Sequence, residues 1–233
     1  MPTTASVHDR LRAAAFDLFD EQGYDATTVD AIAARAGVGR TTFFRAFASK
    51  EDVIFPDHAS VLAEIEARLR AASDGASFLA VTEAARLPLR RYLDEGELAR
   101  RRYRLTSTVP ALRAREIATT AQYRRTFRRF IDTWIGDDPL APLRAELMAD
   151  AVVTAHNHVL RTWLQGTGDD RSAETAFDVA MAEVRRIFLD SAVAGSDGDG
   201  TTVVVMRSGA SLTSVLPRLQ AALDGPETAR RRT

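Results

Sequence analysis

Apolar side chains recur at helical spacing along almost the whole chain, and this pattern limits the possible fold more than any other feature. Stripes at i, i+3, i+4 and i+7 are interrupted by Gly, Pro and short polar runs, which end helices. The spacing predicts an all-α fold, with helices over residues 7–22, 28–36, 40–47, 50–72, 76–93, 96–107, 111–135, 140–165 and 172–192.

Residues 195–233 have a different pattern. The run GSDGDG over 195–200 predicts a flexible linker, and TTVVVM over 201–206 has the β-branched content of a strand. An amphipathic stretch over 212–223 predicts one more helix, and the tail from Gly225 is expected to be disordered. Because a lone strand leaves backbone groups unpaired, we expect 195–233 to form a strand-helix arm that reinforces a dimer.

Composition excludes several classes of protein. With 45% hydrophobic residues the chain can bury a core, yet no window reaches the roughly 18 to 20 apolar residues of a membrane helix. The N-terminal residues lack the apolar run of a secretory signal, so we expect a cytoplasmic protein. The chain has no cysteine, and His156 and His158 are two apart and point in different helical directions. We therefore expect no catalytic residue, cofactor, metal or membrane partner.

Two short helices joined by a glycine-containing turn, Gly37–Gly39, indicate a helix-turn-helix. The second helix of such a motif enters the major groove of DNA, where base pairs show distinguishable donors and acceptors. Phe43 and Phe47 are four residues apart and should pack inward. The polar side chains at the start of this helix are then candidates for base contacts: Arg40, Thr41 and Thr42.

Phosphate contacts are expected from the cap before the first of these helices and from nearby cations, because exposed N–H groups and positive charges attract anions. The candidates are Thr27, Thr28, Arg45 and Lys50, the only lysine of the chain. Residues 1–55 hold six cations and eight acidic residues, so binding would depend on how these few cations are presented.

The segments LFDEQGYDATTV and TTVDAIAARAGVGRTTFFRAFASKEDV resemble the DNA-binding domain of TetR-family transcriptional regulators over about Val7–Phe55. The sequence departs from the family pattern at Phe44, where a tyrosine is usual, and at Gly39, where a small hydroxyl residue is common. We therefore transfer no phosphate hydrogen bond to position 44. The resemblance implies a double-stranded, pseudo-palindromic operator, a homodimer formed by the last two long helices, and a repressor released by a small-molecule effector.

On this basis we expect a DNA-binding domain over 1–55, a helical effector-binding and dimerisation domain over 56–194, and the arm over 195–233. The helix predicted over 50–72 would join the first two domains. In the helices predicted over 140–165 and 172–192, apolar residues that include Leu147, Trp163, Phe177 and Met181 suit close packing, either against a partner or within the chain.

The effector pocket is expected to be apolar, with aromatic residues and one histidine as candidates: Phe78, Tyr103, Tyr123, Phe127, Phe130, Trp134 and His156. Core packing explains these aromatic residues equally well. Residues 86–129 hold 13 arginines against four acidic residues. They could form a cationic rim for a carboxylic acid or coenzyme A thioester, or pair with the acidic stretch over 169–200.

Two other classes of protein remain open at this stage. An enzyme with a helical cavity would need a general base such as His58 or His156. A ligand carrier or a DNA-compacting protein would bind without preferring any operator. Helical spacing alone does not separate these classes from a regulator.

Overall fold

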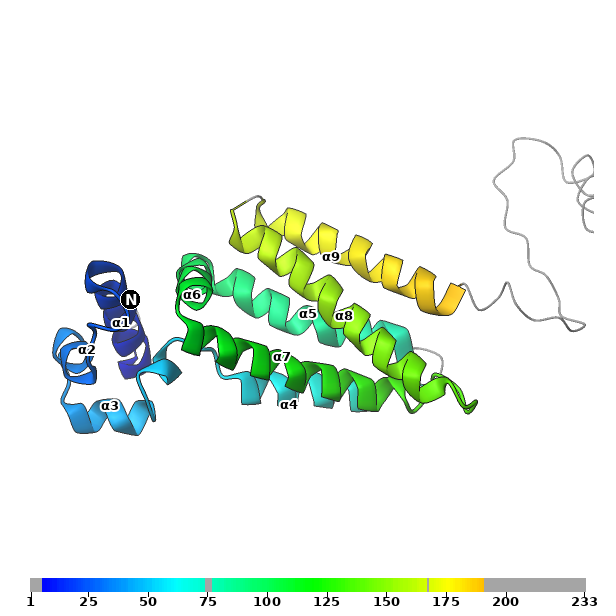
Figure 1. Cartoon of the computed structure of the whole chain (residues 1–233), viewed down its shortest axis with the longest axis horizontal. Coiled ribbons are helices and arrows are strands. Elements are labelled where there is room, and N and C mark those ends of the chain that lie inside the picture. The colour runs from blue at the N-terminus through cyan, green and yellow to red at the C-terminus, as the bar shows by residue number, and fades with distance from the viewer. Residues whose placement is uncertain (1–5, 74–76, 167, 191–233) are drawn as a thin grey trace, which may run out of the picture. The chain divides into compact units, whose positions relative to one another are not determined.

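The computed structural model describes residues 6–73, 77–166 and 168–190 (Figure 1). This part of the chain contains α-helices and two short turns of other helix types, and it contains no strand, which confirms the all-α prediction here. The strand and helix expected after residue 200 lie outside the described residues. The α-helices are α1 (Val7–Gln22), α2 (Val29–Arg35), α3 (Arg40–Ala46), α4 (His58–Arg70), α5 (Ser77–Glu95), α6 (Glu97–Thr108), α7 (Pro110–Ile131), α8 (Ala141–Leu164) and α9 (Asp170–Arg185).

The helix predicted over 50–72 is wrong in its first turns. Ser49 does cap a turn, accepting a hydrogen bond from the Asp52 N–H at 3.3 Å, but only the 3-10 turn η1 (Glu51–Val53) follows. Pro56 disfavours the α conformation at the preceding residue and has no N–H to continue a helix. The chain starts again at α4, where the Asp57 carboxylate accepts from the Ser60 N–H at 3.1 Å.

The other predicted helices are present with shifted ends. α9 begins at Asp170, because the Asp169 side chain caps it by accepting from the Ser172 N–H at 2.8 Å. It continues into the π-helical turn η2 (Arg186–Asp190). α7 ends at Ile131, four residues before the predicted end.

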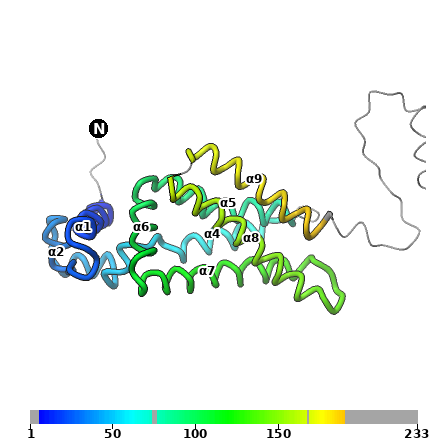
Figure 2. The backbone as a smooth tube through the Cα atoms, turned by 45° about the horizontal axis from the view of Figure 1, so that its top comes forward, coloured from blue at the N-terminus to red at the C-terminus, as the bar shows by residue number. Residues whose placement is uncertain are grey.

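The apolar core of α1–α3 is completed by helices far along the chain. Phe16, Ile32 and Phe43 are fully buried in a cluster that also contains Leu105 of α6 and Leu112 of α7. α6 lies between α1 and the larger group of helices in both views (Figures 1 and 2). Its Arg101 forms ion pairs with Asp17 at 3.0 Å and Asp20 at 2.8 Å on α1. The helix-turn-helix is therefore attached through α6 as well as through the chain.

A second core joins α4, α5, α7, α8 and α9, which lie side by side (Figure 2). Its fully buried side chains include Ile65, Leu89, Ile131, Met148 and Phe177. Within the described residues, each helix is too short or too polar to cross a membrane. The two cores do not divide at one point of the chain, because Leu105 and Leu112 belong to the core of α1–α3.

Candidate nucleic-acid interface and internal cavity

The turn between α2 and α3 is built by a few backbone contacts. Thr28 caps α2, its hydroxyl accepting from the Ala31 N–H at 3.2 Å. Gly37 has a φ of 67°, a left-handed conformation that glycine adopts without strain. The Val38 N–H then donates to the Ala33 carbonyl at 2.9 Å, which closes the end of α2 and directs the chain into α3.

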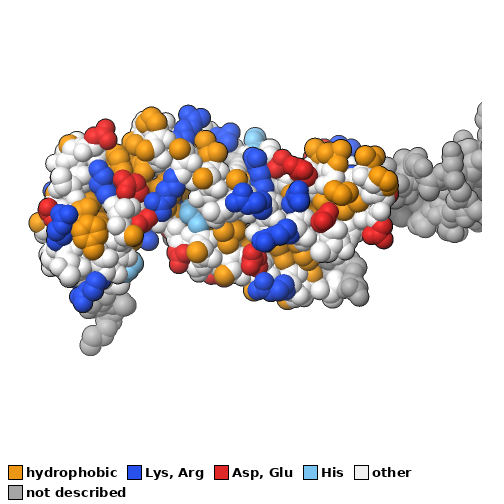
Figure 3. Space-filling view, turned by 60° about the horizontal axis from the view of Figure 1, so that its bottom comes forward, with side chains coloured by type: hydrophobic (Ala, Val, Ile, Leu, Met, Phe, Trp, Pro, Cys, Tyr) orange, Lys and Arg blue, Asp and Glu red, His pale blue; other side chains and the backbone are white. Residues whose placement is uncertain are grey.

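α3 has one buried and one exposed face. Phe43 and Phe47 are buried, which confirms that they point inward. The sequence-predicted base contacts lie on the other side: Arg40 and Thr41 are exposed and Thr42 is half-buried. Phe44 is 44% exposed beside them. Figure 3 shows basic and apolar side chains next to each other on the viewed face of this end of the molecule.

The Arg40 side chain is held by two neighbours. Its Nη1 forms an ion pair with Asp30 of α2 at 2.6 Å, and its guanidinium carbon lies 5.1 Å from the centre of the Phe44 ring. Both charged side chains are largely exposed, so the pair contributes at most about 1 kcal/mol. Arg40 can therefore exchange Asp30 for another hydrogen-bond acceptor at little cost.

The four residues predicted to contact phosphate fall into two groups. Thr28 and Arg45 are exposed, and Arg45 forms no ion pair with any described residue. Thr27 is only 1% exposed, and its hydroxyl donates to the Gly23 carbonyl at 2.8 Å and accepts from Gln22 Nε2 at 3.2 Å. The Thr27 side chain thus belongs to the turn before α2 and does not face solvent.

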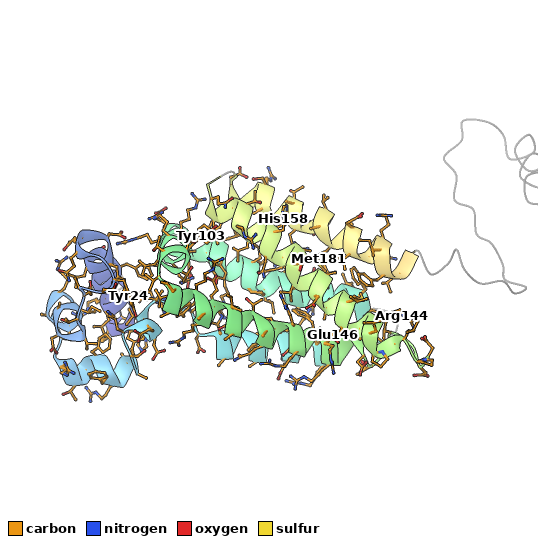
Figure 4. All side chains as sticks on the ribbon, viewed as in Figure 1. Tyr24, Tyr103, Arg144, Glu146, His158 and Met181 are labelled. Atoms are coloured by element: carbon orange, nitrogen blue, oxygen red, sulfur yellow. The ribbon has the colours of Figure 1, made fainter. Side chains whose placement is uncertain are left out.

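Lys50 is also occupied inside the protein. Its Nζ donates to the carbonyls of Tyr24 at 2.8 Å and Thr27 at 3.0 Å, and it lies 3.9 Å from the centre of the Tyr24 ring, labelled in Figure 4. The Tyr24 hydroxyl in turn donates to Glu51. Lys50 therefore ties the turn at 24–27 to η1, a role that the sequence analysis missed.

An internal cavity of about 70 Å³ lies among α4, α5, α7 and α8. Three of the predicted pocket residues line it: Tyr123, Phe127 and His156. The lining also includes His58 and Tyr92, and sequence analysis missed further lining residues that include Glu116 and Asn157. Glu116 lies seven residues before Tyr123, so helical spacing from Tyr123 could have identified it, whereas His58 depends on where α4 begins.

The remaining pocket candidates lie elsewhere. Phe78 and Trp134 line a surface groove near the end of α9. Tyr103, labelled on α6 in Figure 4, lines a groove on the outside of α6, α7 and α8, and Phe130 packs against the larger core. The prediction of one aromatic pocket is therefore wrong for these four residues, because their positions along the helix axes separate them from the cavity.

His156 faces the cavity as a neutral ring. Its Nδ1 lies 3.0 Å from the Ala85 carbonyl on α5, one turn before Pro88. A carbonyl can only accept, so Nδ1 carries the proton. Burial of the ring lowers the pKa of His156 to about 4, because water no longer stabilises the charged form.

His58 connects the start of α4 to α7. Its Nδ1 lies 3.0 Å from the Tyr123 hydroxyl, and its ring centre lies 6.3 Å from that of Phe55, in the core of the helix-turn-helix. Burial, and then the positive charges of Arg102 and Arg115, lower the pKa of His58 to about 4. Burial also raises the pKa of the Tyr123 hydroxyl.

We expect the protein to lose stability as the pH falls below 6.5, the ordinary pKa of histidine. Between pH 6.5 and about 4 the unfolded chain binds protons that folded His58 and His156 exclude, whereas above pH 6.5 neither state binds them. The two groups should together remove about 2 kcal/mol of unfolding free energy over the first pH unit. Urea unfolding above and below pH 6.5 at one protein concentration measures this loss, and His156→Gln should roughly halve it. An equal loss in wild type and variant would contradict the assignment.

The arginines do not form a rim around this cavity. No arginine lines it. Besides His58 and His156, Glu116 is the one titratable acid or base in its lining that ordinarily carries a charge. Arg86, which is buried, pairs with Glu174 at 2.6 Å and with Asp178, and Arg90 also pairs with Glu174. These contacts support the pairing with the acidic stretch. Other arginines pair with acids on several helices.

A wider groove of about 570 Å³ opens beside the cavity. It shares Glu116, Thr120, Asn157 and Leu160 with the cavity, and its own lining includes Arg113, Arg124 and Arg161. Arg113 and Arg124 are the arginines of the 86–129 stretch that line this groove. The outer groove is therefore lined by arginines, whereas the acidic residue Glu116 lies where the groove meets the cavity.

α8 and α9 present apolar side chains to solvent. Leu147 on α8 is 50% exposed, Val179 on α9 is 67% exposed, and Ile187 on η2 is 49% exposed. His158, labelled on α8 in Figure 4, lines a shallow groove between these helices together with Val179. Trp163, Phe177 and Met181 are buried within the chain, so that part of the predicted apolar set belongs to the intramolecular core.

Comparison with known proteins identifies this architecture. The profile of bacterial regulatory proteins of the tetR family matches residues 11–55, and that of the MftR C-terminal domain matches 77–188. The transcriptional regulator TcmR of Streptomyces glaucescens is 30% identical over 78% of this chain and 84% of its own length. MftR of Mycobacterium tuberculosis, named as a mycofactocin biosynthesis transcriptional regulator, is 28% identical over 74% of this chain and 88% of its own length.

A solved structure shows the same fold. The transcriptional regulator from Aquifex aeolicus has a TM-score of 0.53 and 16% identity, covering 78% of this chain and all of its own. Fold and sequence together define a DNA-binding transcriptional regulator. The chain belongs to the TetR family. Its matched relatives are regulators and not enzymes, as the sequence analysis expected.

Proposed function

We propose that the protein is a homodimeric repressor that α3 positions on a pseudo-palindromic operator. The observation that carries this proposal is the exposed face of α3, which presents Arg40, Thr41 and Thr42 while Phe43 anchors the helix from below. Arginine can form two hydrogen bonds to guanine, and threonine can contact bases through its hydroxyl or its methyl group. In the DNA complex Arg40 would leave Asp30 for a base edge.

Thr28 and Arg45 are the phosphate contacts in this proposal. Thr28 at the start of α2 and Arg45 on α3 are both exposed, and a phosphate contact by either would not specify sequence. We leave out the side chains of Thr27 and Lys50, because their polar atoms already have partners inside the protein. With so few cations per subunit, specific affinity requires that two subunits bind together, each with residues 1–55 as its DNA-binding domain.

The dimer would form through α8 and α9. Their exposed apolar residues Leu147 and Val179, with Ile187 of η2, would pack against the same residues of a second copy related by a two-fold axis. Such a dimer would present two copies of α3 to half-sites about one DNA turn apart. The cytoplasm, which holds the DNA of a bacterial cell, is the expected site of action.

An effector in the internal cavity would weaken DNA binding through the junction between η1 and α4. Arg102 of α6 is buried there: its Nε donates to the Ile54 carbonyl at 2.6 Å, and its Nη2 pairs with Glu95 at 2.6 Å. The same guanidinium lies 5.4 Å from the ring of Tyr92, which lines the cavity. A ligand that moves Tyr92 or His58 therefore acts on residues that touch the helix-turn-helix core.

Coupling of this kind is reciprocal. A ligand that prefers the arrangement with poorly spaced α3 helices lowers operator affinity, and operator DNA must lower ligand affinity by the same factor. The cavity measures about 70 Å³, whereas usual ligand pockets measure about 300 Å³ or more, so an effector of ordinary size would bind only if the cavity widens.

Selection from random DNA duplexes tests the proposal. The purified full-length protein is expected to enrich a sequence with two inverted half-sites about one helical turn apart. Enrichment of a single half-site would contradict the dimer on DNA, and the absence of any enriched sequence would favour a carrier or a DNA-compacting protein.

A further inference from the structure

His156 brings a hydrogen-bond acceptor to the wall of the internal cavity. Because Nδ1 of His156 donates to the Ala85 carbonyl, Nε2 of the neutral ring carries a lone pair. Nε2 has no partner among the described residues. A bound molecule with only hydrogen-bond acceptors would place an acceptor lone pair against the lone pair of Nε2, without a hydrogen bond between them.

Glu116 adds a negative charge where the cavity meets the outer groove. It is half-buried and forms no ion pair within the described part of the chain. Asn157 lies on the opposite helix and lines the same opening. A carboxylate ligand entering here would pass Glu116 and lose its hydration without meeting a cation in the lining, since no arginine lines the cavity and Arg113, Arg124 and Arg161 line only the outer groove.

The walls of the cavity are largely apolar. Pro88 and Tyr92 on α5 face Phe127 on α7 and Val153 and Leu160 on α8. Its volume of about 70 Å³ holds a few water molecules, whereas a cavity that binds benzene measures about 150 Å³. A ring can therefore enter only if the cavity widens toward the outer groove, with which it shares four lining residues.

We propose that this cavity binds a neutral aromatic molecule whose hydroxyl group donates a hydrogen bond to Nε2 of His156. The inference rests on the proposed function, in which the cavity is the effector site, and it replaces the carboxylic acid or coenzyme A thioester expected from the arginine-rich stretch. His156 would select for the donor, and Glu116 would select against a carboxylate.

Three probes of nearly equal size test this inference by calorimetry on the full-length protein without DNA: para-cresol, para-methylanisole and para-toluate. Para-cresol alone has a hydroxyl donor, so it is expected to bind about tenfold more tightly than para-methylanisole, the effect of one buried hydrogen bond. Para-toluate is expected to bind most weakly. Equal binding of the first two, tightest binding of para-toluate, or no binding of any probe overturns the inference.

Two variants assign the selectivity to residues. In His156→Phe the preference for para-cresol over para-methylanisole should shrink to within about twofold, while para-methylanisole itself still binds. Glu116→Gln lies at the half-buried opening and is expected to fold normally. It should strengthen para-toluate binding at least about fivefold and keep the preference for para-cresol. Unchanged para-toluate binding in Glu116→Gln contradicts the role of this charge.

Failure of this inference is distinguishable from failure of the proposed function. Operator preference is measured by DNA selection without any probe. If the operator is found but the order of the probes is wrong, only the ligand class is overturned. If the probes bind with the expected order of affinity but no duplex is enriched, the ligand class stands and the proposed function as an operator-binding repressor is overturned.

Discussion

Arg40→Ala is expected to lower the affinity for the selected operator by at least about 30-fold. A base contact by arginine discriminates by about 1 to 3 kcal/mol, and a dimer loses two of them. The side chain lies free of the core, paired only with exposed Asp30 and stacked on Phe44, so its removal should leave the fold intact. Affinity for a scrambled duplex of the same length should change much less, which a titration of both duplexes measures.

Arg45→Ala is the matched control, because Arg45 is an exposed arginine on the same helix. As a phosphate contact it should weaken binding to operator and scrambled duplex by the same factor. It should also reduce the slope of log affinity against log salt by about two for the dimer. If both variants weaken the two duplexes uniformly, Arg40 does not read bases.

Val179→Asp is expected to raise the dissociation constant of the dimer by about 100-fold or more. Val179 is 67% exposed on α9, so the change costs little in the monomer. In the proposed interface each subunit would bury a carboxylate without a partner, and an unpaired buried charge costs several kcal/mol. Sedimentation at a series of protein concentrations measures the dissociation constant, and operator affinity should fall with it.

Ile117→Asp provides the comparison for this change. Ile117 is 64% exposed on α7 and lines the outer groove, whose lining includes none of the proposed interface residues, so an aspartate there should leave the dimer unaffected. Dissociation by both variants would indicate a general loss of structure. Dissociation by Ile117→Asp alone would place the interface on α7 and contradict the proposed dimer.

The recognition helix could be predicted from local spacing. Phe43 and Phe47 are four residues apart, which places them on one face of α3 and leaves Arg40 and Thr41 on the other. The resemblance to the TetR family extends over the same residues. For this segment, short-range rules decide both the helix and the direction of its side chains, so sequence alone was sufficient.

The roles of Thr27 and Lys50 could not be predicted in this way. Two adjacent threonines precede α2, and only the position of the first helical turn determines that Thr28 is the cap while Thr27 faces inward. Lys50 is more than twenty residues from the two carbonyls that it binds. Contacts between distant segments have no signal in local periodicity, and the same holds for Arg102 and Ile54.

The cavity was only partly predictable for a related reason. Helical spacing places Tyr123 and Phe127 on one face of α7, but it gives no information about which helix lies opposite. The break at Pro56 moves the start of α4 to His58 and thereby brings that ring into the wall. Sequence reasoning left the arginines between a pocket rim and pairing with the acidic stretch, because their acidic partners lie on other helices and local spacing does not identify them.

Parallel selection of random duplexes by wild type and Thr42→Ala tests the central claim, that α3 reads base pairs as part of a dimer, most directly. The two enriched sequences are expected to share the same spacing of inverted half-sites and to differ by relaxed preference at one position, the same in both half-sites. Identical sequences from both proteins, or changes unrelated by the two-fold symmetry, would contradict it.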